Sequence, residues 1–124
     1  MTENKKKVLI IEDEIATLDM LESLLGAEGY EILTATDGKN GLDLAKKERP
    51  DLILLDIMLF KLDGFKLCRM LKFDENFRNI PIIMVTCLVT PADQQKGKEV
   101  GADEYICKPF KVSDLLAKIK KILG

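Results

Sequence analysis

The feature that most constrains this chain is the regular alternation of short apolar runs with segments of helical spacing. The runs are KVLIIE (7–12), EILTA (31–35), DLILLD (51–56), PIIMVT (81–86) and EYIC (104–107). Near-continuous apolar strands that alternate with helices predict an α/β domain, in which helices cover both faces of a parallel sheet. The second run is the most mixed in character, which favours a position at the edge of that sheet.

The first and last helical segments each carry one apolar stripe. The stripe of the first segment consists of Ile15, Leu18, Leu21, Leu24 and Leu25. The stripe of the last segment consists of Leu115, Leu116, Ile119, Ile122 and Leu123, with Lys118, Lys120 and Lys121 expected to face water. We expect the first helix to end near Gly29.

Composition narrows the class of protein. The chain has 124 residues, of which 47% are apolar and 32% charged, with a formal net charge of −2. This predicts one domain over residues 1–124 with no direct nucleic-acid partner, no signal peptide and no membrane span. The three cysteines, Cys68, Cys87 and Cys107, have no CxxC spacing, which favours reduced thiols in the cytoplasm. The chain has no histidine, so imidazole chemistry must come from a partner.

Polar side chains gather where the predicted strands end. Glu12 ends the first predicted strand and Asp13 comes next, Asp56 ends the third strand and Thr86 the fourth, and Lys108 follows the fifth. Ligands of open parallel sheets bind outside the carboxyl ends of the strands. The sequence therefore predicts three carboxylates, a hydroxyl and an ammonium group at one edge.

Each of these residues also has a plainer explanation. Asp13 could favour the positive start of the first helix, and Lys108 could be an ordinary surface lysine. Asp56 lies between two apolar stretches, where a carboxylate without a partner is costly. Thr86 is free for other work because Thr90 fits the helix cap better, with Pro at the first helical position and an acid two residues later.

The predicted acid cluster needs a cation. Two like charges about 4 Å apart repel by roughly 4 kcal/mol near a protein surface. Three carboxylates and one lysine leave a charge of −2 by count, which a divalent ion would cancel. Oxygen-only ligands favour a hard ion, and Mg²⁺ held by few carboxylates usually serves phosphate chemistry.

These motifs resemble the receiver domain of two-component response regulators over nearly the whole chain. They are the acidic pair Glu12–Asp13, the stretch around Asp56 with Asp63–Gly64, Thr86, Tyr105, Lys108 and Pro109. The resemblance implies a flavodoxin-like (βα)5 fold, a three-layer α/β/α arrangement with strand order 2-1-3-4-5 similar to chemotaxis receivers. It also implies that the domain catalyses only its own phosphorylation and dephosphorylation and is otherwise not an enzyme.

The resemblance assigns roles to the strand-end residues. Asp56 would take a phosphoryl group from a phosphohistidine on a sensor histidine kinase or a histidine phosphotransfer protein. Lys108 and Thr86 would neutralise charge on the phosphoryl oxygens. Mg²⁺ would be held by Glu12, Asp13, Asp56 and the backbone carbonyl of Met58.

A switch follows from the same resemblance. Thr86 would move onto the phosphoryl group and Tyr105 would turn inward behind it. The fourth helical segment, 91–101, is polar and holds Gly97 in its interior, so we expect it to dock weakly. The face formed by the fourth helix, fifth strand and fifth helix should change on phosphorylation. It would then engage a downstream protein or output domain, or form a homodimer.

Departures from the family pattern leave alternatives open. Phe60 stands where relatives usually have Pro, and Glu12 where many have Asp. Cys87 and Cys107 are more simply small buried filler than redox sensors. Met58 occupies the position where a haloacid-dehalogenase phosphatase needs Asp, and the acids after the first strand would repel a flavin phosphate. The serious alternative is a degenerate receiver that scaffolds partners without being phosphorylated. In a receiver that is phosphorylated, Met58 and Leu88 are expected to line the approach of the attacking water and to slow hydrolysis of the aspartyl phosphate.

Overall fold

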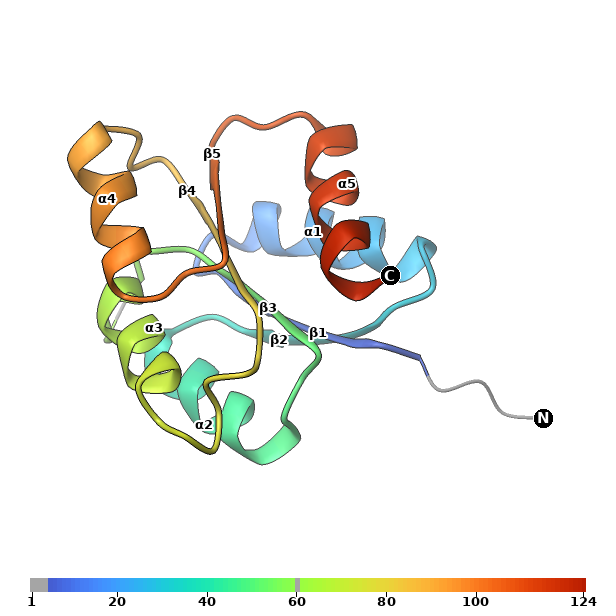
Figure 1. The fold of residues 1–124 in the computed structure, drawn as a ribbon. Coiled ribbons are helices and arrows are strands. Elements are labelled where there is room, and N and C mark those ends of the chain that lie inside the picture. The colour runs from blue at the N-terminus through green and yellow to red at the C-terminus, as the bar shows by residue number, and fades with distance from the viewer. Residues whose placement is uncertain (1–4, 60) are drawn as a thin grey trace.

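A computed structural model of the chain describes residues 5–59 and 61–124 (Figure 1). The strands are β1 (Lys7–Ile11), β2 (Glu31–Ala35), β3 (Leu52–Leu55), β4 (Ile82–Thr86) and β5 (Glu104–Cys107). The helices are α1 (Ile15–Ala27), α2 (Gly38–Glu48), α3 (Gly64–Lys72), α4 (Pro91–Glu99) and α5 (Val112–Leu123). Strands and helices alternate along the whole described chain, as the sequence predicts.

The strands form one parallel sheet in the order β2-β1-β3-β4-β5. β1 is hydrogen bonded to β2 and β3, with Ile11 opposite both Ala35 and Leu55. The mixed strand β2 lies at an edge, as predicted, and the flavodoxin-like order that the resemblance implied is confirmed. The reversal of winding between β1 and β3 places the carboxyl ends of these two central strands side by side.

Helices cover both faces of this sheet (Figure 1). α1 and α5 lie on one face, and α2, α3 and α4 on the other. Alternate residues of β1 serve the two layers: Val8 and Ile10 pack with α1 and α5, whereas Leu9 and Ile11 pack with α2 and α3. Because both faces are buried, the strands read as continuous apolar runs rather than as alternating ones.

The element boundaries differ slightly from the predicted ones. β1 ends at Ile11 and β3 at Leu55, so Glu12 and Asp56 follow the strands instead of ending them. The first helix ends at Ala27, two residues before Gly29, whose φ of +95° suits a glycine. The carboxylates therefore project beyond the edge of the sheet.

Two helical expectations need correction. Ile15 does not join the buried stripe of α1, because its side chain is 56% exposed at the first position of the helix. Lys118 is only partly exposed and its Nζ lies 2.9 Å from Glu104 on β5. Within the described residues, no helix is long and apolar enough to cross a membrane.

Candidate functional site

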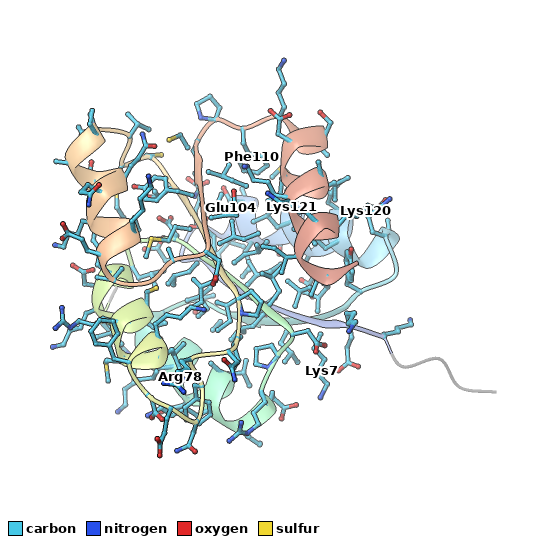
Figure 2. The ribbon with its side chains drawn as sticks, viewed as in Figure 1. Lys7, Arg78, Glu104, Phe110, Lys120 and Lys121 are labelled. Carbon is cyan, nitrogen blue, oxygen red and sulfur yellow. The ribbon has the colours of Figure 1, made fainter. Side chains whose placement is uncertain are left out.

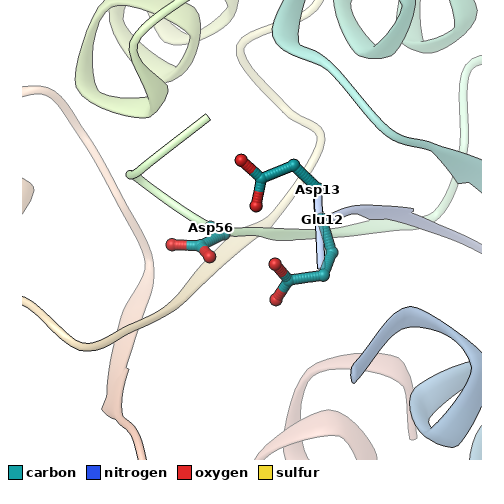
Figure 3. Close-up of side chains that lie close together, drawn as sticks. All are labelled: Glu12, Asp13 and Asp56. Atoms are coloured by element: carbon teal, nitrogen blue, oxygen red, sulfur yellow. The ribbon is translucent and has the colours of Figure 1, made fainter. Parts of the chain in front are cut away.

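The three predicted acids meet at the carboxyl edge of the sheet (Figure 3). One carboxylate oxygen from each of Glu12, Asp13 and Asp56 lies within 4.8 Å of the others. Glu12 and Asp56 are only 3% and 8% exposed, while Asp13 is open to solvent. The cluster thus has two buried members and one open side from which a ligand can approach.

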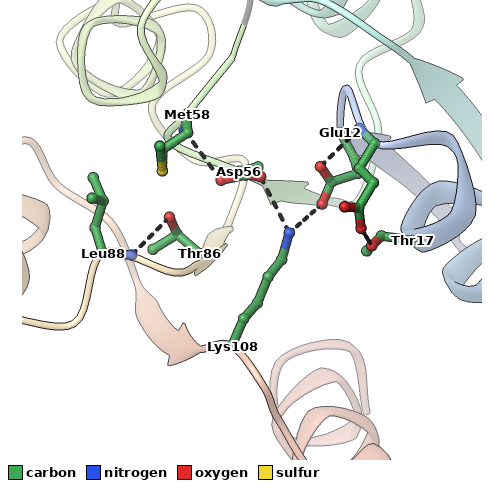
Figure 4. Close-up of polar contacts among 8 residues, drawn as sticks. Glu12, Thr17, Asp56, Met58, Thr86, Leu88 and Lys108 are labelled. Carbon is green, nitrogen blue, oxygen red and sulfur yellow. Dashed lines mark hydrogen bonds and ion pairs between the residues drawn. The ribbon is translucent and has the colours of Figure 1, made fainter.

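Lys108 compensates the two buried acids (Figure 4). Its Nζ donates to Glu12 Oε1 at 2.5 Å and to Asp56 Oδ2 at 3.2 Å. Its backbone N–H donates to the Thr86 carbonyl at 2.8 Å, which holds the start of the loop after β5 beside the end of β4. Lys108 therefore joins the cluster, as the sequence predicts, and is not an ordinary surface lysine.

Burial and pairing oppose each other in Glu12 and in Lys108. Burial raises the pKa of Glu12 to about 7, although the hydrogen bond from Lys108 acts in the opposite direction and the nearby charge of Asp56 adds to the rise. Burial alone would lower the pKa of Lys108, but its hydrogen bond to Glu12 and the charges of Asp56 and Glu12 raise it overall. The lysine consequently stays protonated at the mouth of the site.

The loop after β3 holds the Asp56 carboxylate from the other side. The Met58 N–H donates to Asp56 Oδ1 at 3.1 Å. Gly64 lies so close to this loop that a Cβ there would come within 2.6 Å of the Asp56 carbonyl and 2.5 Å of Ile57 Cα. Asp63 caps α3 by accepting from the Phe65 N–H at 2.7 Å. Phe60, the departure from the family pattern in this loop, lies outside the described residues.

Thr86 and Tyr105 are joined through the backbone of Leu88. Thr86 is fully buried and its Oγ1 accepts from the Leu88 N–H at 3.3 Å (Figure 4). The Tyr105 hydroxyl donates to the Leu88 carbonyl at 2.5 Å, and burial raises the pKa of this phenol to about 12. Sequence reasoning named Leu88 only for its side chain, because no sequence signal marks a backbone bridge.

The N-terminus of α4 is stabilised by a side-chain cap, but few residues of the helix are buried. Thr90 caps the helix as predicted, and with Asp93 it forms a capping box, in which each side chain accepts from the other's backbone N–H. Its one buried residue is Gly97, where a Cβ would lie 2.9 Å from the ring of Tyr105. This agrees with the expectation that the helix docks weakly, and it shows that the interior glycine permits a close approach to the Tyr105 ring.

An open groove of about 800 Å³ borders the acid cluster. Met58 and Leu88, expected to line the approach to Asp56, both line it, as does Asp13. Lys61 and Lys96 line it too, and Lys96 lies 4.7 Å above the ring of Phe65. Both lysines were missed from the sequence, where nothing distinguishes them from other surface lysines.

The remaining site residues need brief comment. Pro109 follows Lys108 through a cis peptide bond and is exposed. Cys87 is exposed, so its description as buried filler is wrong, because the chain turns outward once β4 has ended at Thr86. Cys107 is half-buried on β5.

Comparison with known proteins decides the family. The model of the response regulator receiver domain matches residues 8–120. The chain is a member of the response regulator receiver family. Its curated relatives include a probable transcriptional regulator, ycf27, from Cyanophora paradoxa, 44% identical over 97% of this chain. The transcriptional regulatory protein PhoP of alkaline phosphatase synthesis, from Bacillus subtilis, is 41% identical over 95% of it.

This receiver spans about half the length of those curated relatives, 49% and 48% respectively. Solved structures match it over almost their full length. A CheY-like receiver domain protein from Methanospirillum hungatei has a TM-score of 0.90 and 34% identity, covering 97% of this chain and 94% of its own. The receiver domain of sensor histidine kinase PA1611 from Pseudomonas aeruginosa, solved with a magnesium ion in its active site cleft, has a TM-score of 0.88 and 30% identity, covering 98% and 100%.

Proposed function

We propose that Asp56 of this receiver accepts a phosphoryl group from a phosphohistidine on a partner protein. The observation that carries the proposal is the placement of one carboxylate between a lysine and two further acids. One Asp56 oxygen is held by the Met58 N–H and the other by Lys108, so the carboxylate has a fixed direction. Phosphoryl transfer depends chiefly on such positioning and on charge neutralisation.

The donor set also fits a magnesium ion. The three clustered carboxylates, from Glu12, Asp13 and Asp56, supply oxygen atoms only, which suits Mg²⁺ better than softer metals. We propose these three residues and the Met58 carbonyl as its ligands. When bound, the ion supplies positive charge against the phosphoryl oxygens. The magnesium reported in the cleft of the PA1611 receiver supports the same assignment here.

The residues of the chain then divide the chemistry of transfer. An Asp56 oxygen forms a bond to phosphorus while the phosphorus–nitrogen bond to the partner histidine breaks, and the departing nitrogen keeps the electron pair. Lys108, already bonded to both Glu12 and Asp56, can keep one bond and turn the other onto the phosphoryl group. The Thr86 hydroxyl is free to donate because its present hydrogen bond uses it as an acceptor.

The phosphoryl donor must lie outside this domain, since the domain has no histidine. A sensor histidine kinase or a histidine phosphotransfer protein in the cytoplasm meets that need. We further propose that the receiver catalyses no reaction except its own phosphorylation and dephosphorylation. Relatives named as transcriptional regulators, of which it spans about half, support a downstream role in transcription through an output domain or a separate target.

Phosphorylation would be read on the α4–β5–α5 face. Thr86 is connected to Tyr105 through the two backbone groups of Leu88. Withdrawing the Thr86 hydroxyl from the Leu88 N–H therefore disturbs the residue whose carbonyl Tyr105 binds. Tyr105 in turn touches Gly97 of α4. A phosphorylated Asp56 should therefore shift the backbone amide resonances of this face, and unchanged resonances would argue against the switch.

Phosphorylation itself is tested by intact mass. The protein is incubated with Mg²⁺ and acetyl phosphate, and we expect one added phosphoryl group. Asp56→Asn should abolish the addition, and so should chelation of the metal. Asp63→Asn is the matched control, because it changes a carboxylate in the same groove while asparagine still caps α3. It should be phosphorylated like the wild type.

The scaffold alternative makes the opposite prediction. A degenerate receiver would remain folded and bind Mg²⁺ without any gain in mass. Loss of phosphorylation in both Asp56→Asn and Asp63→Asn would point to a general loss of structure rather than to the acceptor. The match to the receiver family and its transcriptional regulators does not favour the scaffold.

A further inference from the structure

A second charged surface lies at the opposite end of the molecule from the acid cluster. α2 and α3 run antiparallel to the strands they follow, so both end where the strands begin, and Arg78 marks this end in Figure 2. We call this the basic-aromatic surface, made of Lys46, Arg49, Arg69, Met70, Phe73, Phe77 and Arg78. None of these residues has a role in the phosphoacceptor site.

Cations and aromatic rings are stacked on this surface. The guanidinium of Arg49 lies 4.8 Å from the centre of the Phe77 ring, and Lys46 Nζ lies 5.9 Å from the same ring. The guanidinium of Arg69 lies 4.8 Å from the centre of the Phe73 ring. Such stacking restricts long side chains. Arg49 Nη1 also donates to the Asn76 carbonyl at 3.0 Å, which leaves the other guanidinium N–H groups of Arg49 and Arg69 as donors for a ligand.

The positive charge of the surface is not neutralised. None of the six ion pairs among the described residues involves its lysine or arginines. Neighbouring acids are engaged elsewhere, Glu48 with Lys7 and Asp103 with Lys72. The turn after α3 contains two further acids, at positions 74 and 75, which offset only part of the four cations.

Stabilisation of helix ends does not account for the whole arrangement. Cations in the last turn of α2 and α3 interact favourably with the helix dipole, but this stabilisation does not require an aromatic ring beside the cation. Phe73 is 64% exposed and Met70 41% exposed, and the neighbouring Arg69 is exposed as well. Exposed aromatic, methionine and arginine side chains together are typical of the centres of protein interfaces.

We propose that the basic-aromatic surface binds an acidic protein segment that also carries apolar side chains. Its carboxylates would pair with the guanidinium of Arg69 and with the N–H groups of Arg49 other than the Nη1 group that bonds Asn76. Its apolar groups would cover Phe73 and Met70. Nucleic acid fits less well, because a guanidinium already occupies one face of each ring that a base would stack on, and the whole chain is negative. The proposal does not depend on Asp56.

The test uses a short synthetic peptide of glutamates interspersed with leucines, titrated into the ¹⁵N-labelled protein. We expect saturable amide shifts confined to residues 46–49 and 69–78. Arg49→Gln combined with Arg69→Gln should raise the dissociation constant by roughly tenfold or more. Lys120→Gln combined with Lys121→Gln removes the same charge from α5, elsewhere on the molecule in Figure 2, and should leave binding unchanged.

Further probes separate the alternatives. Phe73→Ser should weaken binding, and a glutamate peptide without leucines should bind less tightly than the mixed one. Asp56→Asn should bind like the wild type, which separates this proposal from the phosphoacceptor one. The proposal is overturned if the α5 variant weakens binding equally, if single-stranded DNA binds more tightly than the peptide, or if no saturation occurs at millimolar peptide.

Discussion

α3 and α4 are adjacent helices of nine residues each, yet they are attached to the sheet very differently. α3 buries five residues, Gly64, Phe65, Leu67, Cys68 and Leu71. α4 buries only Gly97. Both helices are capped by the side chain of the residue that precedes them, Asp63 for α3 and Thr90 for α4. The contrast is therefore in docking and not in the start of the helix.

The difference matches the positions of the two helices around the site. α3 begins against the loop that carries Asp56, and its burial fixes that loop through Gly64. α4 follows the loop that joins Thr86 to Tyr105 through Leu88. A nucleophile needs a fixed neighbour, whereas an element that reports phosphorylation must change position at a low cost in free energy. The firmly packed α3 suits the first role and the weakly docked α4 suits the second.

The largest expected effect comes from removing a core side chain of α3. Leu71→Ala should lower the free energy of unfolding by about 2 to 5 kcal/mol, because Leu71 is fully buried and the cavity cannot collapse fully. The matched change in α4, Gln95→Ala, should alter it by less than about 0.5 kcal/mol, since Gln95 is exposed. Urea denaturation measures both. Equal losses would remove the contrast between the helices.

The two interior-facing glycines sharpen the comparison. Gly64→Ala should destabilise the protein by about 1 to 3 kcal/mol, because its Cβ would meet backbone atoms of Asp56 and Ile57 that cannot move aside. It should also slow phosphorylation by acetyl phosphate. Gly97→Ala gains about 1 kcal/mol of helix propensity, offset by displacement of the Tyr105 ring.

Calorimetry and the Tyr105 resonances test this pair together. Gly97→Ala should leave the unfolding temperature nearly unchanged while shifting the ring resonances of Tyr105. A large loss of stability in Gly97→Ala, with Tyr105 unmoved, would mean that α4 is docked more firmly than its burial indicates.

The same two helices show what the sequence could and could not foretell. Alternation of apolar runs predicted the class of fold, and strand-end polar residues predicted the cluster of Glu12, Asp13, Asp56 and Lys108, because parallel strands share one carboxyl edge. The polar character of 91–101 predicted weak docking. Backbone contacts could not be predicted from the sequence. The hydrogen bonds that Thr86 and Tyr105 make to the backbone of Leu88, and the close approach of Gly64 to the loop after β3, do not depend on a recognisable side chain.

Exposure near element ends was also hard to predict. Ile15 and Cys87 have apolar side chains and fit their local patterns, yet both are exposed. An apolar pattern predicts which face of a helix is buried, but it does not predict how far along the helix the element that covers this face extends. Ile15 lies at the first position of α1, and Cys87 lies just past the last strand residue of β4, where the covering layers end.

The caps provide a smaller test of the comparison. Asp63→Ala and Thr90→Ala each remove a side-chain cap worth about 1 kcal/mol. In α3 the loss should appear in global stability, because the helix unfolds with the core. In α4 it should appear as faster amide hydrogen exchange confined to Pro91–Glu99, with the global transition less affected. Uniform exchange changes across the protein in Thr90→Ala would contradict a loosely docked α4.

The smallest expected effect concerns the hydrogen bond at the α4 boundary. Tyr105→Phe removes the bond to the Leu88 carbonyl and should cost about 1 kcal/mol or less. The pKa of the phenol is raised to about 12, so its contribution to stability is present below the ordinary value of about 10 and is lost as the pH rises through 12. Ultraviolet difference absorbance should show a tyrosine titration near pH 12 that vanishes in Tyr105→Phe. If the titration that vanishes in Tyr105→Phe instead lies nearer to 10, Tyr105 spends much of its time facing water, and the boundary of α4 would then be open before any phosphoryl group arrives.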